Sequence, residues 1–149
     1  MLWIVFLANH YMVLKDSKAY AKKAVQYLKQ AYQRKFDDYV VLCYLGSAYN
    51  LLAKDTWNSF DKLSHVNKGI ECMDKAIRKD PNNITMRTIR ANNSKNLPNF
   101  LNRKSIAYED FEYLAGLFEK GLKAPLQLKA SVYSSLAELF KEDGDMAKA

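Results

Sequence analysis

Apolar side chains recur every three to four residues along most of the chain, the spacing that places them on one face of an α-helix. Pro, Gly, Asn and Asp interrupt this pattern at intervals, as they do at helix ends and turns. The pattern predicts an all-α protein of about seven helices, followed by the stub of an eighth after Gly144. The expected helices are 3–15, 18–35, 39–53, 63–79, 84–96, 105–121 and 126–141.

The third of these helices contains a glycine that needs an explanation. Gly46 lies inside the predicted helix 39–53, where glycine costs about 1 kcal/mol relative to alanine. A neighbouring helix that crosses closely at this point would account for it. The inward face of the same helix is expected to consist of Leu42, Leu45, Tyr49 and Leu52.

Two predicted connections, 54–62 and 97–102, are long and contain large apolar side chains. Trp57 and Phe60 belong to the first connection and Phe100 to the second. Because each connection joins the first helix of a pair to the second, we expect both at one edge of the molecule. The aromatic side chains there either pack together as an apolar cap or form an exposed anchor for a partner, since aromatic residues are frequent in binding hot spots.

Small and large apolar residues also recur at a longer period. The positions concerned are Leu42, Leu45, Gly46, Tyr49, Gly69, Met73, Ala76 and Pro81, and again Tyr133, Leu136, Ala137 and Phe140. This spacing resembles the tetratricopeptide repeat, a helix pair of about 34 residues. The resemblance implies one domain, 1–149, built as a right-handed superhelical stack of antiparallel helix pairs. Its repeats would be 3–38, 39–83 and 84–129, with a half repeat at 130–149.

In tetratricopeptide repeats the first helix of each pair lines a concave groove. The resemblance therefore implies groove positions at Val40, Cys43, Ser47, Asn50, Thr85, Thr88, Asn92, Lys95, Ser131, Ser134, Glu138 and Lys141. Family members that bind a chaperone's acidic tail use a fixed set of charged groove residues, which Cys43 and Ser47 do not reproduce. The implied function is a non-enzymatic scaffold that binds a peptide or protein, either in this groove or at the edge formed by the two connections. A structural subunit of an envelope or secretion assembly is the alternative.

Arg87 and Arg90 are three residues apart and share one face of the helix 84–96. Guanidinium groups bind carboxylates and phosphates in a bidentate geometry, so the two side chains could hold an acidic peptide or a phosphate. The other interpretation is an internal ion-pair network, and we favour it because these positions normally face neighbouring helices. The candidate partners in such a network are Asp74, Asp80, Glu109 and Asp110.

The chain of 149 residues has 23 Lys and Arg against 16 Asp and Glu, a net charge of +7. A basic balance is compatible with an acidic partner, a nucleic acid or an anionic lipid surface. The charge is dispersed along the sequence, which favours a solubilising role and disfavours a nucleic-acid-binding module. On helix surfaces, pairs such as Glu71 and Lys75 have the i,i+4 spacing of an ion pair.

Few residues in the chain are suited to catalysis or metal binding. His10 and His65 are the only histidines, and a metal site needs three or four convergent ligands. The chain contains no phosphate-binding glycine loop and no nucleophile elbow. We therefore expect no enzyme activity, no metal and no cofactor. Cys43 and Cys72 are interpreted as small buried apolar residues, and a disulfide between them is left open.

The N-terminal run 1–7 is strongly apolar. No positively charged segment precedes it and no small-residue cleavage site follows it, so it does not match a signal peptide. It is also much shorter than the ~20 residues that span a bilayer. We expect a buried helix at 3–15, including Trp3, through which the protein self-associates or binds a cognate protein. The default location is cytoplasmic, unless the chain is a fragment of an exported protein.

Overall fold

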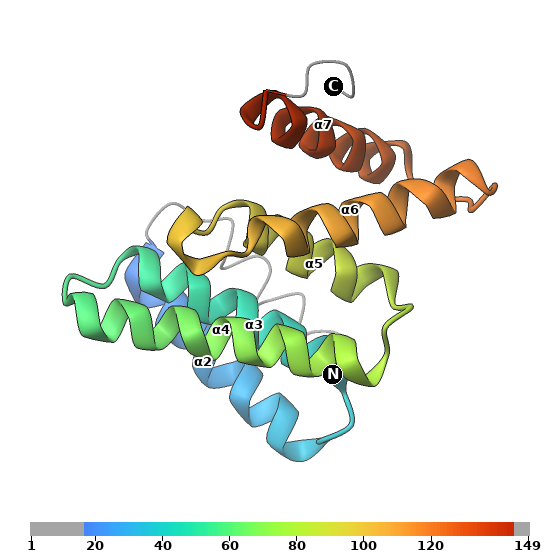
Figure 1. Cartoon of the computed structure of the whole chain (residues 1–149). Helices are drawn as coiled ribbons and strands as arrows, with labels where there is room; N and C mark the ends of the chain where they lie inside the picture. The colour runs from blue at the N-terminus through green and yellow to red at the C-terminus, as the bar shows by residue number, and fades with distance from the viewer. Residues whose placement is uncertain (1–16, 145–149) are drawn as a thin grey trace. The chain divides into compact units, whose positions relative to one another are not determined.

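The computed structural model describes residues 17–144, and this part of the chain is all-α, without β-strands (Figure 1). Its helices are α2 (Ser17–Arg34), α3 (Tyr39–Lys54), α4 (Ser59–Lys79), α5 (Ile84–Lys95), the 3-10 helix η1 (Asn99–Leu101), α6 (Lys104–Glu119) and α7 (Leu126–Glu142). The all-α prediction is confirmed. The helix expected at 3–15, with Trp3, and the stub after Gly144 lie outside the described residues.

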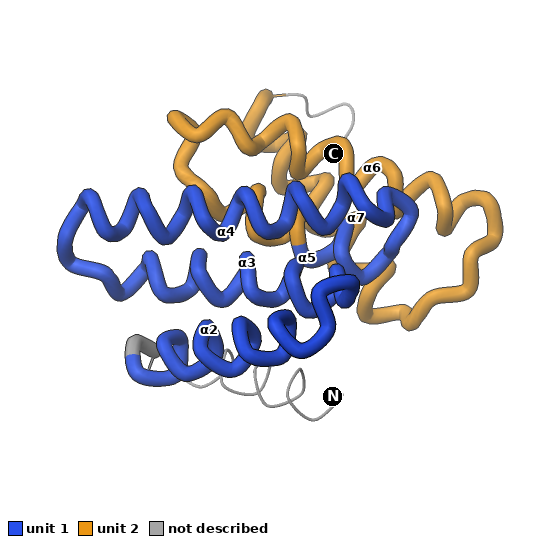
Figure 2. Tube along the Cα trace, turned by 90° about the horizontal axis from the view of Figure 1, so that it is seen from below, with its two compact units in different colours: residues 1–89 blue, residues 90–149 orange. Residues whose placement is uncertain are grey.

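The chain divides into two compact units, residues 1–89 and 90–149 (Figure 2). The first unit contains α2, α3, α4 and the first part of α5. The second contains the rest of α5 together with η1, α6 and α7. The single superhelical stack of helix pairs implied by the repeat resemblance stays a prediction.

In the first unit α3 packs against both α2 and α4, and Figure 2 shows the three helices side by side in chain order. Their apolar faces form one core, with Leu28, Leu45 and Met73 among its members. The predicted inward face of α3 is confirmed, because all four of its residues are buried: Leu42, Leu45, Tyr49 and Leu52. The expected close crossing at Gly46 is also confirmed, since Gly46 of α3 meets Gly69 of α4.

The first connection is shorter than the sequence suggested. Helix α4 begins at Ser59 rather than 63, because the side-chain oxygen of Asn58 caps it. This oxygen accepts hydrogen bonds from the backbone N–H of Phe60 (2.8 Å) and Asp61 (3.2 Å), which satisfies two donors of the first turn. Phe60 therefore belongs to the helix, and only residues 55–58 connect α3 to α4. The prediction of a connection over 54–62 was wrong.

In the second unit α6 and α7 pack antiparallel. Tyr108, near the start of α6, contacts Phe140 near the end of α7, with ring centroids 5.2 Å apart. Phe118, near the end of α6, contacts Tyr133 in the middle of α7, with ring centroids 6.3 Å apart. Buried apolar residues lie on both helices, among them Ala107, Phe111, Leu114, Val132, Leu136 and Leu139. Among the described helices, none has the length and hydrophobicity needed to cross a membrane.

Candidate functional site

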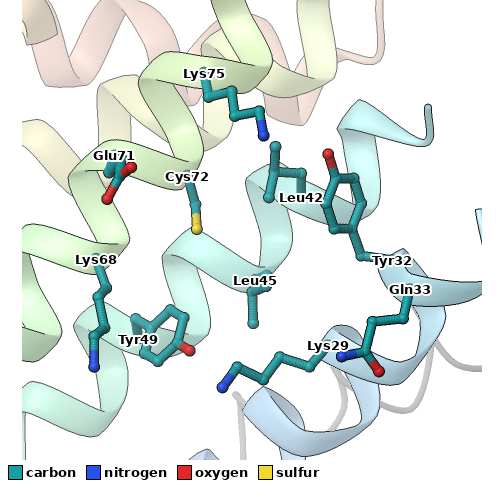
Figure 3. A pocket seen from close by; sticks show the side chains of 10 residues that line it. All are labelled: Lys29, Tyr32, Gln33, Leu42, Leu45, Tyr49, Lys68, Glu71, Cys72 and Lys75. Atoms are coloured by element: carbon teal, nitrogen blue, oxygen red, sulfur yellow. The ribbon is translucent and has the colours of Figure 1, made fainter. Parts of the chain in front are cut away.

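An open groove of about 370 Å³ lies over α3 in the first unit, between α2 and α4 (Figure 3). Ten side chains line it: Lys29, Tyr32 and Gln33 from α2, Leu42, Leu45 and Tyr49 from α3, and Lys68, Glu71, Cys72 and Lys75 from α4. We refer to this feature as the α2–α4 groove.

The floor of the α2–α4 groove is apolar. It consists of Leu42, Leu45 and Tyr49, which recur on one face of α3 at helical spacing. All three side chains are less than a tenth exposed and belong to the hydrophobic core of the unit. The groove therefore opens directly onto this core.

The rim of the groove is mainly cationic. Lys29 comes from one wall, and Lys68 and Lys75 come from the other, whereas Glu71 is the only acidic residue in the lining. Among residues 17–144, neither Lys68 nor Lys75 forms an ion pair. The i,i+4 spacing of Glu71 and Lys75 thus does not produce the ion pair expected from the sequence. Within the described part of the chain, these two ammonium groups on α4 are thus available to a ligand.

The ring of Tyr49 is held by contacts from both neighbouring helices. The ammonium nitrogen of Lys29, on α2, lies 5.8 Å from the ring centroid, a cation–π arrangement. His65, on α4, stacks on the ring at a centroid distance of 6.1 Å and an interplanar angle of 19°. These contacts fix the phenol ring as part of the floor.

The two cysteines have different environments, and both are free thiols. Cys43 is fully buried and its Sγ donates to the carbonyl oxygen of Met86 at 3.6 Å, which confirms its interpretation as a buried residue. Cys72 is partly buried and its Sγ points into the α2–α4 groove (Figure 3). Burial raises the pKa of the Cys72 thiol, as does the nearby Glu71 carboxylate, while Lys75 and Lys29 act in the opposite direction.

The groove positions implied by the repeat resemblance are divided between the two units. In the first unit Ser47 is half-buried and Asn50 is buried. The hydroxyl of Thr88 donates to the carbonyl oxygen of Ile84 at 2.8 Å, one turn earlier in the same helix. Cys43 is also buried, so this face of α3 offers little surface to a ligand.

In the second unit the structure brings Lys95 and Glu138 together. The ammonium group of Lys95 lies 2.6 Å from a carboxylate oxygen of Glu138 and 3.2 Å from the hydroxyl of Ser135. This ion pair connects α5 to α7, so the two opposite charges compensate each other within the protein. Asn92, the third predicted groove residue of this unit, is half-buried on α5.

Arg90 forms an internal ion pair rather than an anion site. Its guanidinium makes two hydrogen bonds to Asp110, at 2.7 Å and 2.9 Å, and a third to the exposed Glu109 at 3.3 Å. Arg90 and Asp110 are both buried. Arg87 is buried as well, and its Nε donates to the carbonyl oxygen of Pro81 at 2.6 Å. Of the two interpretations of the arginines, the structure favours the internal network.

The aromatic residues that the sequence assigned to the two connections are exposed instead of packed, although Phe60 lies in α4. Trp57 is 97% exposed, Phe60 87% and Phe100 74%, so none is covered by an apolar cap in the described part of the chain. Trp57 directly precedes the N-cap of α4, where an apolar residue often packs against the fourth helical residue. That residue is Lys62 here, which leaves Trp57 without this local structural role.

The sequence pattern did not identify the three lysines that line the α2–α4 groove, Lys29, Lys68 and Lys75. A signal was present on α4, where Lys68, Glu71, Cys72 and Lys75 recur every three to four residues beside the core face.

Among the described residues, no group of three or more His, Cys, Asp and Glu side chains is placed to hold a metal ion. Comparisons with protein-family models, curated proteins and solved structures find no significant match to this chain.

Proposed function

We propose that this protein is a non-enzymatic scaffold that binds a peptide segment of a protein partner in the α2–α4 groove. The observation that supports this most directly is the groove lining, which combines an apolar floor with a cationic rim. Ligand sites typically measure 300–1,000 Å³ and pair an apolar lining with a few polar groups. A groove of about 370 Å³ offers room for a few side chains of a bound segment.

The chemistry of the lining disfavours an enzyme. A catalytic cysteine requires a thiol whose pKa is lowered, so that the thiolate is present near neutral pH. Burial shifts the pKa of Cys72 upwards instead. His65, the histidine on the same helix, does not line the groove, and its ring stacks on Tyr49. The groove is therefore better suited to binding than to reaction.

The α2–α4 groove differs from the groove implied by the tetratricopeptide resemblance. Its floor is the face of α3 that carries Leu42, Leu45 and Tyr49. The resemblance assigns ligand binding to another face of the same helix, which carries Ser47 and Asn50. The resemblance thus supports a scaffold function, whereas the lining supports a different location for the ligand.

A second candidate is a structural subunit that joins a larger assembly through its exposed aromatic residues. Trp57 and Phe60 favour it, because both side chains are almost fully exposed beside the N-cap of α4. Aromatic anchors of this kind contribute strongly when a partner covers them. The two candidates place the partner on different parts of the first unit, so one experiment separates them.

The test is a selection of random twelve-residue peptides, displayed on phage, with the native protein as bait. Selected peptides are measured again on Cys72→Phe, which fills the groove, and on Trp57→Ala, which removes the exposed indole. Circular dichroism establishes that each variant keeps its helices. Wild-type protein labelled at Cys72 with benzylmaleimide gives an independent way to block the groove.

Peptides that lose binding when the groove is blocked but keep it in Trp57→Ala support the proposed function. Peptides with the opposite behaviour support the assembly candidate. If no selected peptide depends on either change, the proposal of a peptide-binding groove is wrong.

A further inference from the structure

Lys and Arg are spread along the described chain, but most of the net positive charge belongs to the unit that contains the α2–α4 groove. Residues 17–89 have 13 Lys and Arg against 7 Asp and Glu, a net charge of +6. Residues 90–144 have 8 against 7, a net charge of +1. A partner that carries negative charge is therefore attracted to the first unit, and the attraction weakens with added salt.

The lysines of the rim are arranged on two walls. Lys68 and Lys75 are seven residues apart on α4, which corresponds to about 10 Å along the helix. An extended peptide advances about 3.3 Å per residue, so the same distance separates side chains about three residues apart. Lys29 lies on the opposite wall, on α2, and Leu42 and Leu45 form the floor below.

We infer that the groove binds an acidic peptide in which apolar residues are flanked by two carboxylates about three residues apart. The carboxylates pair with Lys68 and Lys75, and the apolar side chains cover Leu42 and Leu45. This inference rests on the proposed function, because it names the kind of peptide that the same groove accepts.

Three features favour an acidic peptide over a single-stranded nucleic acid. Nucleic-acid grooves use aromatic faces for base stacking, but Tyr49 already contacts Lys29 and His65 through its ring. Glu71 lies between Lys68 and Lys75 in the sequence of α4 and repels a continuous phosphate backbone. The leucines of the floor match an aliphatic side chain better than a sugar or a phosphate.

The probe is a fluorescein-labelled peptide of sequence GSDLLDSG, whose binding is followed by fluorescence anisotropy at low and high salt. Two matched probes separate the contributions: GSNLLNSG removes the charges and GSDSSDSG removes the apolar side chains. The protein variant Lys68→Gln/Lys75→Gln removes two rim charges. Its control, Lys22→Gln/Lys23→Gln, removes the same charge from exposed positions of α2 that do not line the groove.

We expect GSDLLDSG to bind at least tenfold more tightly than either matched probe. The rim variant should lose at least tenfold in affinity, while the control variant should lose less than threefold. An equal loss of affinity in both variants would show that only the net charge of the protein matters, and it would overturn the inference. So would absence of binding at millimolar peptide, or tighter rim-dependent binding of a twelve-nucleotide oligothymidine.

The proposed function is judged separately from this inference. Suppose that GSNLLNSG binds as tightly as GSDLLDSG and that neither peptide binds the Cys72→Phe variant. The groove then binds peptides without requiring acidic residues. The inference then fails and the proposed function stands. If the phage selection yields no groove-dependent peptide, the proposed function fails as well.

Discussion

Gly46 of α3 and Gly69 of α4 lie against each other where the two helices cross. A Cβ atom added to Gly46 would lie 2.6 Å from the carbonyl oxygen of Gly69 and 2.7 Å from a side-chain carbon of Met73. A Cβ added to Gly69 would lie 2.8 Å from the carbonyl oxygen of Gly46 and would also clash with Asn50. The two helices can therefore approach this closely only because neither glycine has a Cβ atom.

Gly46→Ala should lower the free energy of unfolding by about 2 kcal/mol, because overpacking costs more than the gain in helix propensity returns. Gly116→Ala is the matched control, since a Cβ at this helical position of α6 meets nothing within 4 Å. It should raise stability by about 0.5–1 kcal/mol. Urea unfolding followed by circular dichroism measures both changes. A stabilised Gly46→Ala variant would contradict the close crossing.

Asp110→Ala should be strongly destabilising, by about 3–5 kcal/mol, because it leaves the buried guanidinium of Arg90 without its main partner. Glu109→Ala removes the exposed carboxylate of the same network and should lower the free energy of unfolding by about 1 kcal/mol or less. Both values come from urea unfolding. Equal losses of stability in the two variants would contradict this prediction, because the buried and the exposed carboxylate would then contribute equally.

The start of α6 and the end of α7 are joined by a pH-dependent contact. The ammonium group of Lys104 and the hydroxyl of Tyr108, at 2.7 Å, both donate to Asp143. These hydrogen bonds lower the pKa of Asp143 below its ordinary value of 3.8, and the Lys104 bond has the larger effect. The carboxylate therefore favours the folded state above pH 3.8, as long as Lys104 and Tyr108 keep the protons that they donate. This contribution is lost as the pH falls through the lowered pKa.

Replacing Lys104 with Met should move the pKa of Asp143 back towards its ordinary value. Carboxyl ¹³C chemical shifts, followed through an acid titration, measure this pKa directly. Asp143→Asn should also flatten the acid side of the stability profile, whereas Glu112→Gln, an exposed change on α6, should leave it unaltered. If the pKa of Asp143 is the same in Lys104→Met as in the wild type, the contact is absent in solution.

The two thiols should react at very different rates with an aromatic disulfide reagent. In the folded protein one equivalent should react, at Cys72, because Cys43 is fully buried. The reaction should be slow at neutral pH and accelerate towards alkaline pH, since burial raises the pKa of the Cys72 thiol. Both thiols should react in urea. Cys72→Ser abolishes the native-state reaction if the assignment is correct.

Removing either of the exposed aromatic side chains, Trp57 or Phe60, should not affect folding. Trp57→Ala and Phe60→Ala should each change the free energy of unfolding by about 0.5 kcal/mol or less, because their side chains lie almost entirely in solvent. Phe111→Ala, a fully buried change, should cost about 3–5 kcal/mol. Thermal unfolding compares the three variants. A large loss in Trp57→Ala would reveal a structural contact and weaken the case for a partner surface.

Helical periodicity was sufficient to predict the described α-helices and the buried face of α3, but not the 3-10 helix η1, which lies in a predicted connection. It placed the start of α4 four residues too late, because Ser59, Asp61 and Lys62 resemble a polar loop. The cap formed by Asn58 decides this boundary, and capping depends on one side chain rather than on a pattern. The close approach at Gly46 could be predicted because a glycine inside a helix needs a packing reason.

The α2–α4 groove was not predictable in the same way. Its lining comes from three helices, and α2 and α4 are separated by the whole of α3 in the sequence. Lys29 and Lys75 were recognisable as surface residues, but their position around one opening depends on how the helices pack. The internal role of Arg90 was among the predicted alternatives, because its candidate partners included Asp110.

The floor of the α2–α4 groove is at the same time a wall of the hydrophobic core. A molecule that settles on Leu42 and Leu45 contacts a floor that is assembled only in the folded unit, so it binds the folded unit alone. Occupancy and folding are then linked, so that ligand at a hundred times its dissociation constant adds about 2.7 kcal/mol to stability. The melting temperature of this unit should therefore rise when a peptide of the proposed kind occupies the groove.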